Sequence, residues 1–336
     1  MLLLALVALM MAAAWPTSSP PRPAVRAAAT EQSDPDLYRA TIRRVAAGEN
    51  YYAAAADGLR KGGYPLKPFL TFRLPALTLL HAHIPAIAVT TLQALLALAV
   101  LLVWWGRLAG LGLVQRVLAG VLIIAGTAGL LSPAAGLLHE SWAGLLLALM
   151  IGLRRPGHAA AAIVAGALAL AIRETALPMI LVMGGLALVE RRWNEALGWA
   201  AVVALFMAAM AAHAAMVASV VRPDDLASPG WSAMLGARFA LSAVAAVSSA
   251  TLLPSALAAF LILLSLFGWI SVATGWALRV SLLLLGYATM LALFARPDTF
   301  YWALLAAPLS LVGLVFVPRA IAALVSAARG VAQRTA

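Results

Sequence analysis

The sequence contains no cysteine and few charged residues. Without cysteine the chain has no disulfide framework, no thiolate metal site and no cysteine nucleophile. Only 10% of the 336 residues are charged, and the twelve acidic residues are outnumbered by 23 lysines and arginines. Because a soluble domain is about a quarter charged, this composition excludes an ordinary soluble domain.

The common catalytic motifs are absent as well. We find no glycine-rich phosphate loop, no GxSxG turn and no Walker pattern. The HExxH pattern is incomplete, because Ala143 stands where the second histidine would follow His139-Glu140. His81 and His83 lack further ligands at metal-binding spacing. The sequence therefore predicts no cofactor and leaves the metal requirement open, and it excludes nucleotide-sugar chemistry in a soluble cytoplasmic domain.

The chain has instead long apolar runs, with 64% hydrophobic residues and a mean hydropathy of +0.99. The runs do not alternate with period two, which excludes a barrel and leaves helices as the structures that satisfy backbone groups in lipid. We predict an all-α, polytopic transmembrane helical bundle, one integral-membrane domain over 1–336. About ten spans are expected, with eleven as the alternative, and some are short or re-entrant.

Hydropathy and arginine placement divide this domain into segments. Residues 1–15 form a first span or signal-anchor, 16–75 an outer loop, 76–318 the remaining helices and 319–336 a cytoplasmic tail. We expect helices at 84–105, 113–132, 138–153, 195–219, 254–272, 277–295 and 300–318, a re-entrant or interfacial segment at 236–252, and two short helices within 156–190 that break at Arg173-Glu174-Thr175 and Pro178.

The net charge of +11 indicates which segments face the cytoplasm. Positive residues favour the cytoplasmic side, which puts Arg107, Arg154, Arg191, Arg319 and their neighbours inside and the loop 16–75 outside. The excess charge suits anionic membrane lipids, and no basic-aromatic cluster supports nucleic-acid binding. We expect an integral protein of a bacterial inner (plasma) membrane whose active face is extracytoplasmic.

The stretch 34–75 is the longest polar passage of the chain. Apolar residues recur there at helical spacing, which predicts an amphipathic helix at 36–47 ended by Gly48 and a second helix at 50–61 ended by Gly62-Gly63. Such helices lie on a membrane surface with the apolar side down. The sequence therefore predicts a polar platform at the outer face of the bilayer.

Two aspartates of this platform are candidates for a general base. The first possibility is that Asp34 and Asp36 only stabilise a helix N-terminus, where carboxylates interact favourably with the helix dipole. Alternatively, one of them takes the proton from an acceptor hydroxyl. The basic residues Arg60, Lys61, Lys67 and Arg73 either contact headgroups or bind a phosphate.

Two further polar pairs interrupt the apolar helices. Arg173-Glu174 lies at a break between two short helices, and an ionisable pair inside a membrane is a functional candidate by default. His139-Glu140 begins another span, where a carboxylate also suits a helix N-terminus.

The platform resembles the first outer loop of the GT-C superfamily of integral-membrane glycosyltransferases. The resemblance rests on Asp34-Pro-Asp-Leu-Tyr38, Gly48-Glu-Asn-Tyr51 and Tyr64-Pro65 through Pro75, and it covers the first two-thirds of the chain best. It implies transfer of a sugar from a polyprenyl-phosphate donor to a lipid or glycan acceptor, with a loop aspartate as base. The chain departs from the family in its short first run and the lack of a large C-terminal domain.

On this reading Asp34 or Asp36 is catalytic, and the substrate is bound by Tyr38, Tyr51, Arg73, His139, Glu140, Arg173 and Glu174. Two other classes of function stay open. One is a transporter or flippase of a lipid-linked intermediate, which the absence of internal repeats disfavours. The other is a non-catalytic membrane assembly protein with the polar loop as a docking surface.

Overall fold

The structure is a computed structural model that describes residues 34–131 and 134–335, with side chains up to Ala328. The predicted first span at 1–15 and the linker to residue 33 lie outside the described residues. The chain divides into two compact units, and the division falls inside helix α5 (Ala86–Arg107). The N-terminal unit comprises 34–99 and 130–231, and the C-terminal unit comprises 100–129 and 232–335. That both belong to one membrane domain remains a prediction.

The platform consists of two helices, as predicted. Helix α2 (Asp34–Ala46) buries Leu37, Thr41 and Val45, and helix α3 (Tyr51–Lys61) packs against it. Asn50 caps α3, since its side chain accepts from the backbone N–H of Tyr52. Gly48 follows α2 with φ +92°, a conformation that glycine adopts without strain.

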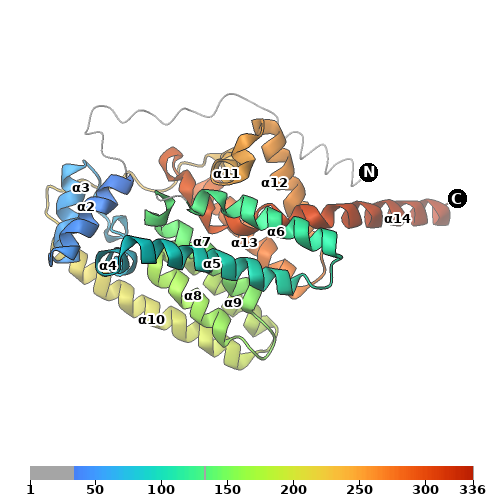
Figure 1. Cartoon of the computed structure of the whole chain (residues 1–336), viewed down its shortest axis with the longest axis horizontal. Coiled ribbons are helices and arrows are strands. Elements are labelled where there is room, and N and C mark those ends of the chain that lie inside the picture. Colours follow the sequence, from blue (N-terminus) through green and yellow to red (C-terminus); the bar gives the residue numbers. More distant parts are fainter. Residues whose placement is uncertain (1–33, 132–133, 336) are drawn as a thin grey trace. The chain divides into compact units, whose positions relative to one another are not determined.

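A bundle of short apolar helices forms the rest of the N-terminal unit. It contains α4 (Pro75–His83), α7 (His139–Leu153), α8 (Ala160–Ile172), α9 (Leu177–Val189) and the longer α10 (Trp193–Ala218). Helices α7 and α8 pack side by side, as do α9 and α10 (Figure 1). The predicted break between two short helices is confirmed, because Arg173 and the short turn η4 (Glu174–Ala176) separate α8 from α9.

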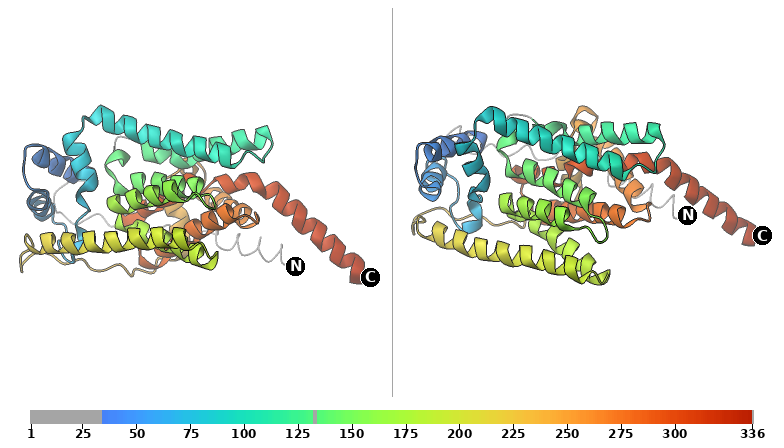
Figure 2. Two further views of the ribbon diagram at one scale, coloured as in Figure 1. Left: turned by 90° about the horizontal axis from the view of Figure 1, so that it is seen from below. Right: turned by 60° about the horizontal axis from the view of Figure 1, so that its bottom comes forward.

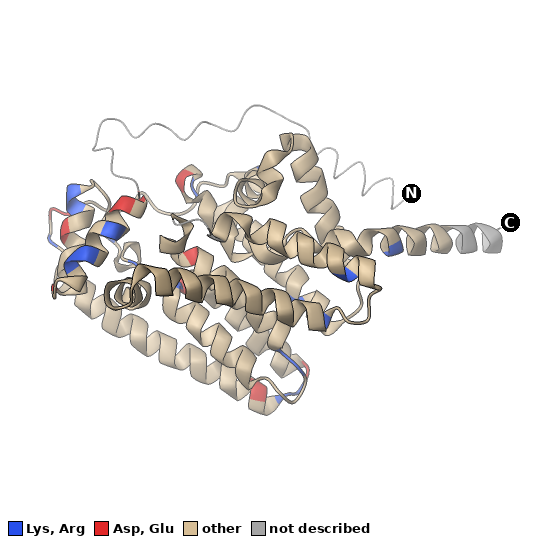
Figure 3. Ribbon diagram, in the orientation of Figure 1, with Lys and Arg blue, Asp and Glu red and all other residues tan. Residues whose placement is uncertain are grey.

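Polar contacts close both ends of this bundle. Arg154 follows α7 and pairs with Glu195 at 2.9 Å and with Glu190, at the turn between α9 and α10. The platform lies at the other end, where Val217 of α10 joins the core of α3 (Figure 2). Figure 3 shows charged residues at these two ends of the unit and few between them.

The C-terminal unit contains the end of α5 with α6 (Leu113–Thr127), α11 (Gly236–Ala246), α12 (Ser255–Ile270), α13 (Gly275–Phe294) and α14 (Val317–Thr335). Helix α11 is short and packs on α12 and α13; that the segment 236–252 is re-entrant or interfacial stays a prediction. The prediction of one helical span at 300–318 is wrong in detail. This region forms three 3-10 segments, η6 (Pro297–Leu305), η7 (Ala307–Leu309) and η8 (Val312–Phe316).

A proline and a close backbone approach account for the 3-10 segments. Pro308 lies inside the predicted span and lacks the N–H that a continuous α-helix needs there. A Cβ on Gly313 would collide with the backbone oxygen of Ser265, and one on Gly268 would collide with that of Gly313. The backbone of η8 therefore lies directly against the backbone of α12. The residues predicted as a tail, 319–336, belong largely to helix α14.

The polytopic membrane character is clear from length and composition. Among the described residues, five helical stretches are long and apolar enough to cross a bilayer, and five shorter apolar helices accompany them. The long ones are Ala86–Arg107, Leu113–Leu130, Trp193–Ala218, Gly275–Phe294 and Ala307–Ala328. The predicted all-α, polytopic class is confirmed.

Candidate functional site

The N-terminal unit brings together polar side chains from five separate parts of the chain. They come from the first half of α2, from the start of α3, from the loop between α3 and α4, from the start of α7, and from the junction of α8 with η4. These positions lie at or near helix ends. At the ends of an apolar bundle, polar side chains can lie close together without contacting lipid chains. We call this group the platform cluster; its members are Asp34, Tyr38, Tyr51, Tyr64, Arg73, His139, Glu140, Arg173 and Glu174.

The two candidate aspartates have different surroundings. Asp34 is half-buried, and its carboxylate accepts a hydrogen bond of 2.6 Å from the Tyr64 hydroxyl. Asp36 lies at the surface, with 52% of its side chain exposed, and pairs at 2.9 Å with Arg39 one turn along α2. Asp34 belongs to the platform cluster, whereas Asp36 makes an ordinary surface pair of low energy.

Tyr38 is the point where the charges of the cluster meet. The Arg73 Nε donates to the Tyr38 hydroxyl oxygen at 3.2 Å. Burial raises the pKa of Tyr38, Arg73 opposes that rise, and the carboxylates of Asp34 and Glu140 add to it. Tyr38 therefore stays protonated at neutral pH, so its hydroxyl can donate a hydrogen bond.

Tyr51 fixes the backbone beside Arg73. Its hydroxyl donates to the Arg73 carbonyl oxygen at 2.6 Å, and burial raises the pKa of this tyrosine well above its usual value. This contact ties α3 to the segment before α4 across 22 residues. Tyr51 thus orients Arg73 through its backbone.

Arg173 joins the two other carboxylates of the cluster. Its Nε donates to Glu140 at 2.6 Å, and its Nη1 to Glu174. The side chains of Arg173 and Glu140 are 2% and 1% exposed, whereas Glu174 is 17% exposed. The predicted pairing of Glu174 with Arg173 is confirmed, and Glu174 is the most accessible member of the three.

His139 is buried between α7 and the platform. Its ring meets the Tyr38 ring edge-on with centroids 5.6 Å apart. The sequence had suggested a substrate contact here. In the structure His139 packs against Tyr38, so its direct effect is on the position of that hydroxyl.

The other basic residues of the platform have partners outside the platform cluster, and two of them contact the loop after α10. Arg60 forms two hydrogen bonds of 2.7 Å with Asp225, and Lys67 donates to the Pro223 carbonyl at 3.0 Å. Lys61 pairs with Asp57 on its own helix at 2.8 Å. Of the four basic candidates for a phosphate, Arg73 is the one that lies in the platform cluster.

Sequence reasoning missed one pair of residues beside the cluster. His213, near the C-terminal end of α10, shares a 3.1 Å hydrogen bond between its Nδ1 and the Tyr52 hydroxyl, and Phe69 packs near its ring. A histidine within an apolar span was itself a usable signal. Tyr64 was noted in the motif, but nothing in the sequence pointed to its bond with Asp34.

The described residues contain no group of three or more histidines, aspartates and glutamates that could hold a metal ion. No family model, no curated protein and no solved structure matches this chain.

Proposed function

We propose that the protein is a membrane glycosyltransferase that moves a sugar from a polyprenyl-phosphate donor to a hydroxyl of a lipid or glycan acceptor. One observation carries the proposal: a half-buried carboxylate, Asp34, and a guanidinium, Arg73, which donates to the Tyr38 hydroxyl, are both close enough to influence the pKa of Tyr38 at one end of an apolar bundle. Sugar transfer from a lipid phosphate needs a base for the acceptor and a cation for the departing phosphate. A donor held by a polyprenyl chain reaches such a site from the bilayer.

Asp34 acts as the general base in this proposal. It takes the proton of the acceptor hydroxyl while that oxygen attacks the anomeric carbon of the sugar. The bond from that carbon to the phosphate oxygen breaks, and polyprenyl phosphate leaves with the electron pair. Attack opposite the leaving group inverts the configuration at the anomeric carbon.

Arg73 stabilises the negative charge of the leaving phosphate, and Tyr38 donates a hydrogen bond nearby. Arg173 has two carboxylate partners, so its role is to hold Glu174 in position. Glu174, the more exposed carboxylate, accepts hydrogen bonds from sugar hydroxyls. Glu140 is buried against Arg173 and holds the guanidinium of that arginine in place.

The experiment is donor retention by the purified protein, read by mass spectrometry of co-purified lipids. Wild type should retain a polyprenyl-phosphate sugar. Arg73→Gln should lower donor affinity at least about tenfold, because a hydrogen bond to a charged group is lost. The substitution keeps the Arg73 backbone carbonyl that accepts from Tyr51, and circular dichroism checks that the variant is folded.

Arg39→Gln is the matched control, since Arg39 carries the same charge on the same platform but pairs with the exposed Asp36. It should retain the donor as wild type does. Equal donor binding by wild type and Arg73→Gln would contradict the proposal. Retention of an intact lipid-linked oligosaccharide without transfer would favour a flippase, and retention of no lipid-linked sugar an assembly protein.

A further inference from the structure

The C-terminal unit contains a cavity that the proposed function does not use. Its volume is about 640 Å³, within the range of small-molecule sites. It opens between the loop after α5, the turn from α12 to α13, and the first turns of α14. We call it the basic pocket, because the charged residues of its lining are Arg107 and Arg319 and none of its lining residues is acidic.

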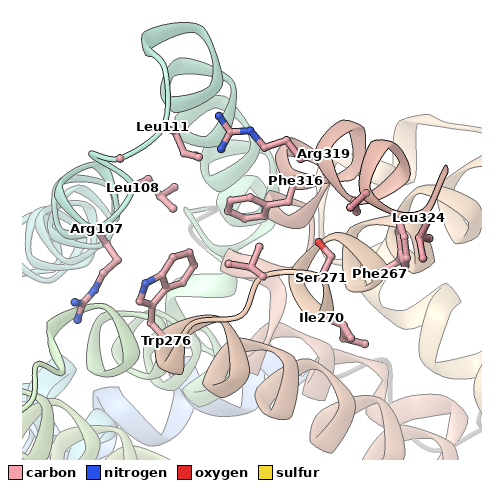
Figure 4. A pocket seen from close by; sticks show the side chains of 14 residues that line it. Arg107, Leu108, Leu111, Phe267, Ile270, Ser271, Trp276, Phe316, Arg319 and Leu324 are labelled. Atoms are coloured by element: carbon pink, nitrogen blue, oxygen red, sulfur yellow. The ribbon is translucent and has the colours of Figure 1, made fainter. Parts of the chain in front are cut away.

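The floor of the basic pocket is aromatic and rigid. Trp276 and Phe316 line it, and both pack on Trp269 with ring centroids 5.9 and 5.2 Å away. The indole N–H of Trp269 donates to the Leu309 carbonyl at 2.9 Å, which fixes that ring. Figure 4 shows Phe316 and Trp276 between Arg319 and Arg107. An apolar floor with cations at its sides suits an amphiphile that has one anionic group.

The charge of the whole unit fits an anionic ligand. Over 100–129 and 232–336 the sequence has a single acidic residue, Asp298, which pairs with Arg296 at 3.2 Å. The same stretches contain eight arginines: Arg107, Arg116, Arg238, Arg279, Arg296, Arg319, Arg329 and Arg334. Such an excess attracts anionic lipid headgroups.

The surroundings of the basic pocket point to lipid as the occupant. Helix α14 is amphipathic and begins with exposed Arg319, while Ile321 and Leu324 of the same helix are 41% and 37% exposed. Exposed apolar side chains next to arginines are typical of a helix in contact with headgroups and upper acyl chains. Arg116 and Trp105 flank the loop after α5, and the Arg116 guanidinium carbon lies 4.3 Å from the centre of the Trp105 ring. Tryptophan is enriched at membrane interfaces.

We propose that the basic pocket binds one anionic phospholipid of the cytoplasmic leaflet. Its phosphate lies at Arg319, Arg107 attracts the headgroup from the other side of the aromatic floor, and its upper acyl chains lie on Phe316, Trp276 and Leu324. The rest of both chains stays in the bilayer, so the cavity needs to enclose only part of the lipid. The arginine rule assigns the leaflet, because the loop at Arg107 and the start of α14 are both predicted to be cytoplasmic.

The test is native mass spectrometry of the full chain in neutral detergent with defined lipids. The probes are dioleoyl phosphatidylglycerol, dioleoyl phosphatidylcholine with the same chains, and undecaprenyl phosphate. We expect one tightly retained phosphatidylglycerol, bound in preference to phosphatidylcholine. Removing Arg319 or Arg107 as Arg319→Gln or Arg107→Gln should weaken binding about fivefold each, and the double variant about 25-fold. Undecaprenyl phosphate, which the platform cluster binds in the proposed function, should be retained equally by wild type and by the basic-pocket variants.

Three variants separate this site from general electrostatics. Arg319→Lys keeps a positive charge and should keep most of the binding. Arg296→Gln removes one charge of the same unit outside the basic pocket and should bind as wild type. Ala323→Trp keeps every charge but fills the cavity, since Ala323 lines it, and should bind as weakly as the double variant. Circular dichroism and gel filtration confirm that each variant is folded.

Three results would overturn the proposal. One is equal retention of phosphatidylcholine, or a loss of undecaprenyl phosphate that parallels the loss of phosphatidylglycerol in the folded basic-pocket variants. A second is an equal loss of binding in folded Arg296→Gln, which would make the effect one of net charge. The third is unchanged binding in folded Ala323→Trp, or a dimer that retains no lipid, which would mean that a second copy covers the pocket.

Discussion

At the scale of single residues, contacts separate side chains that the sequence leaves equivalent. Asp34 and Asp36 stand two positions apart, and either one suits a helix N-terminus or a catalytic base. The structure turns Asp34 toward Tyr64 and Asp36 toward Arg39. No spacing rule in the sequence could supply this, because the partner Tyr64 comes 30 positions later, after two helices.

The buried ion pair between Arg173 and Glu140 gives a prediction for single substitutions. Arg173 and Glu140 are 33 positions apart and almost fully buried, at 2.6 Å. Removing one partner of a buried pair leaves an uncompensated charge, which costs about 3–5 kcal/mol. We expect Arg173→Gln and Glu140→Gln each to lower the free energy of unfolding by that amount, measured by denaturant titration in detergent.

The double variant should lose much less than the two single losses combined, because neither buried charge remains at that contact. Arg39→Gln, which breaks an exposed pair, should cost about 1 kcal/mol or less. Strictly additive losses in the double variant would mean that the two side chains do not interact.

At the scale of elements, the sequence predicted helices well and their interruptions only in part. The helices at 36–47, 50–61, 138–153 and 195–219 lie within a few residues of α2, α3, α7 and α10. Apolar periodicity and glycine ends are local signals, so they can be read without a fold. The 3-10 segments after α13 have one local signal, Pro308. They also depend on Gly313 lying against α12, which is a tertiary contact and leaves no local pattern.

The short helices also explain where the site lies. Helices α8 and α9 have 13 residues each, about 20 Å of helix, against a hydrocarbon core of about 30 Å. We therefore expect their ends, including Arg173, to lie close to the apolar region of the bilayer. A polar cluster there can act on a headgroup whose chain remains in lipid.

The loop after α10 should respond to pH through Asp225. The Arg60 hydrogen bond, together with the backbone N–H of Arg222, lowers the pKa of Asp225 to about 2. A lowered folded pKa stabilises the contact above the unfolded value of about 4. The contribution is lost as the pH falls from about 4 to 2, so the loop should stay docked at pH 5 to 8.

Arg60→Gln should undock this loop at neutral pH. Hydrogen exchange should then rise at Leu66 and Lys67, whose N–H groups donate to the Leu226 carbonyl, while exchange in α7 stays unchanged. Lys61→Gln, which removes a neighbouring exposed charge, is the control. Unchanged exchange at Leu66 in Arg60→Gln would contradict the role given to Asp225.

At the scale of the whole molecule, the orientation in the membrane is a prediction from arginine placement. The absence of cysteine makes it easy to test, because single cysteines need no prior removal of others. Lys61 of α3 has 74% of its side chain exposed, and His158, between α7 and α8, is exposed too.

Lys61→Cys should react with an impermeant maleimide in intact cells, because the platform is predicted to be extracytoplasmic. His158→Cys should react only after the membrane is permeabilised. Labelling in the reverse order would invert the topology and separate the platform cluster from an extracytoplasmic acceptor.

The most direct test of the account is the transfer rate of Asp34→Asn beside that of Asp36→Asn, with a polyprenyl-phosphate sugar as donor. Asparagine keeps the size of the side chain and can still accept from Tyr64, but it cannot take a proton. We predict a loss of about 10²–10⁴-fold for Asp34→Asn and near wild-type transfer for Asp36→Asn, since asparagine serves a helix start nearly as well. Full transfer activity in Asp34→Asn would contradict the account.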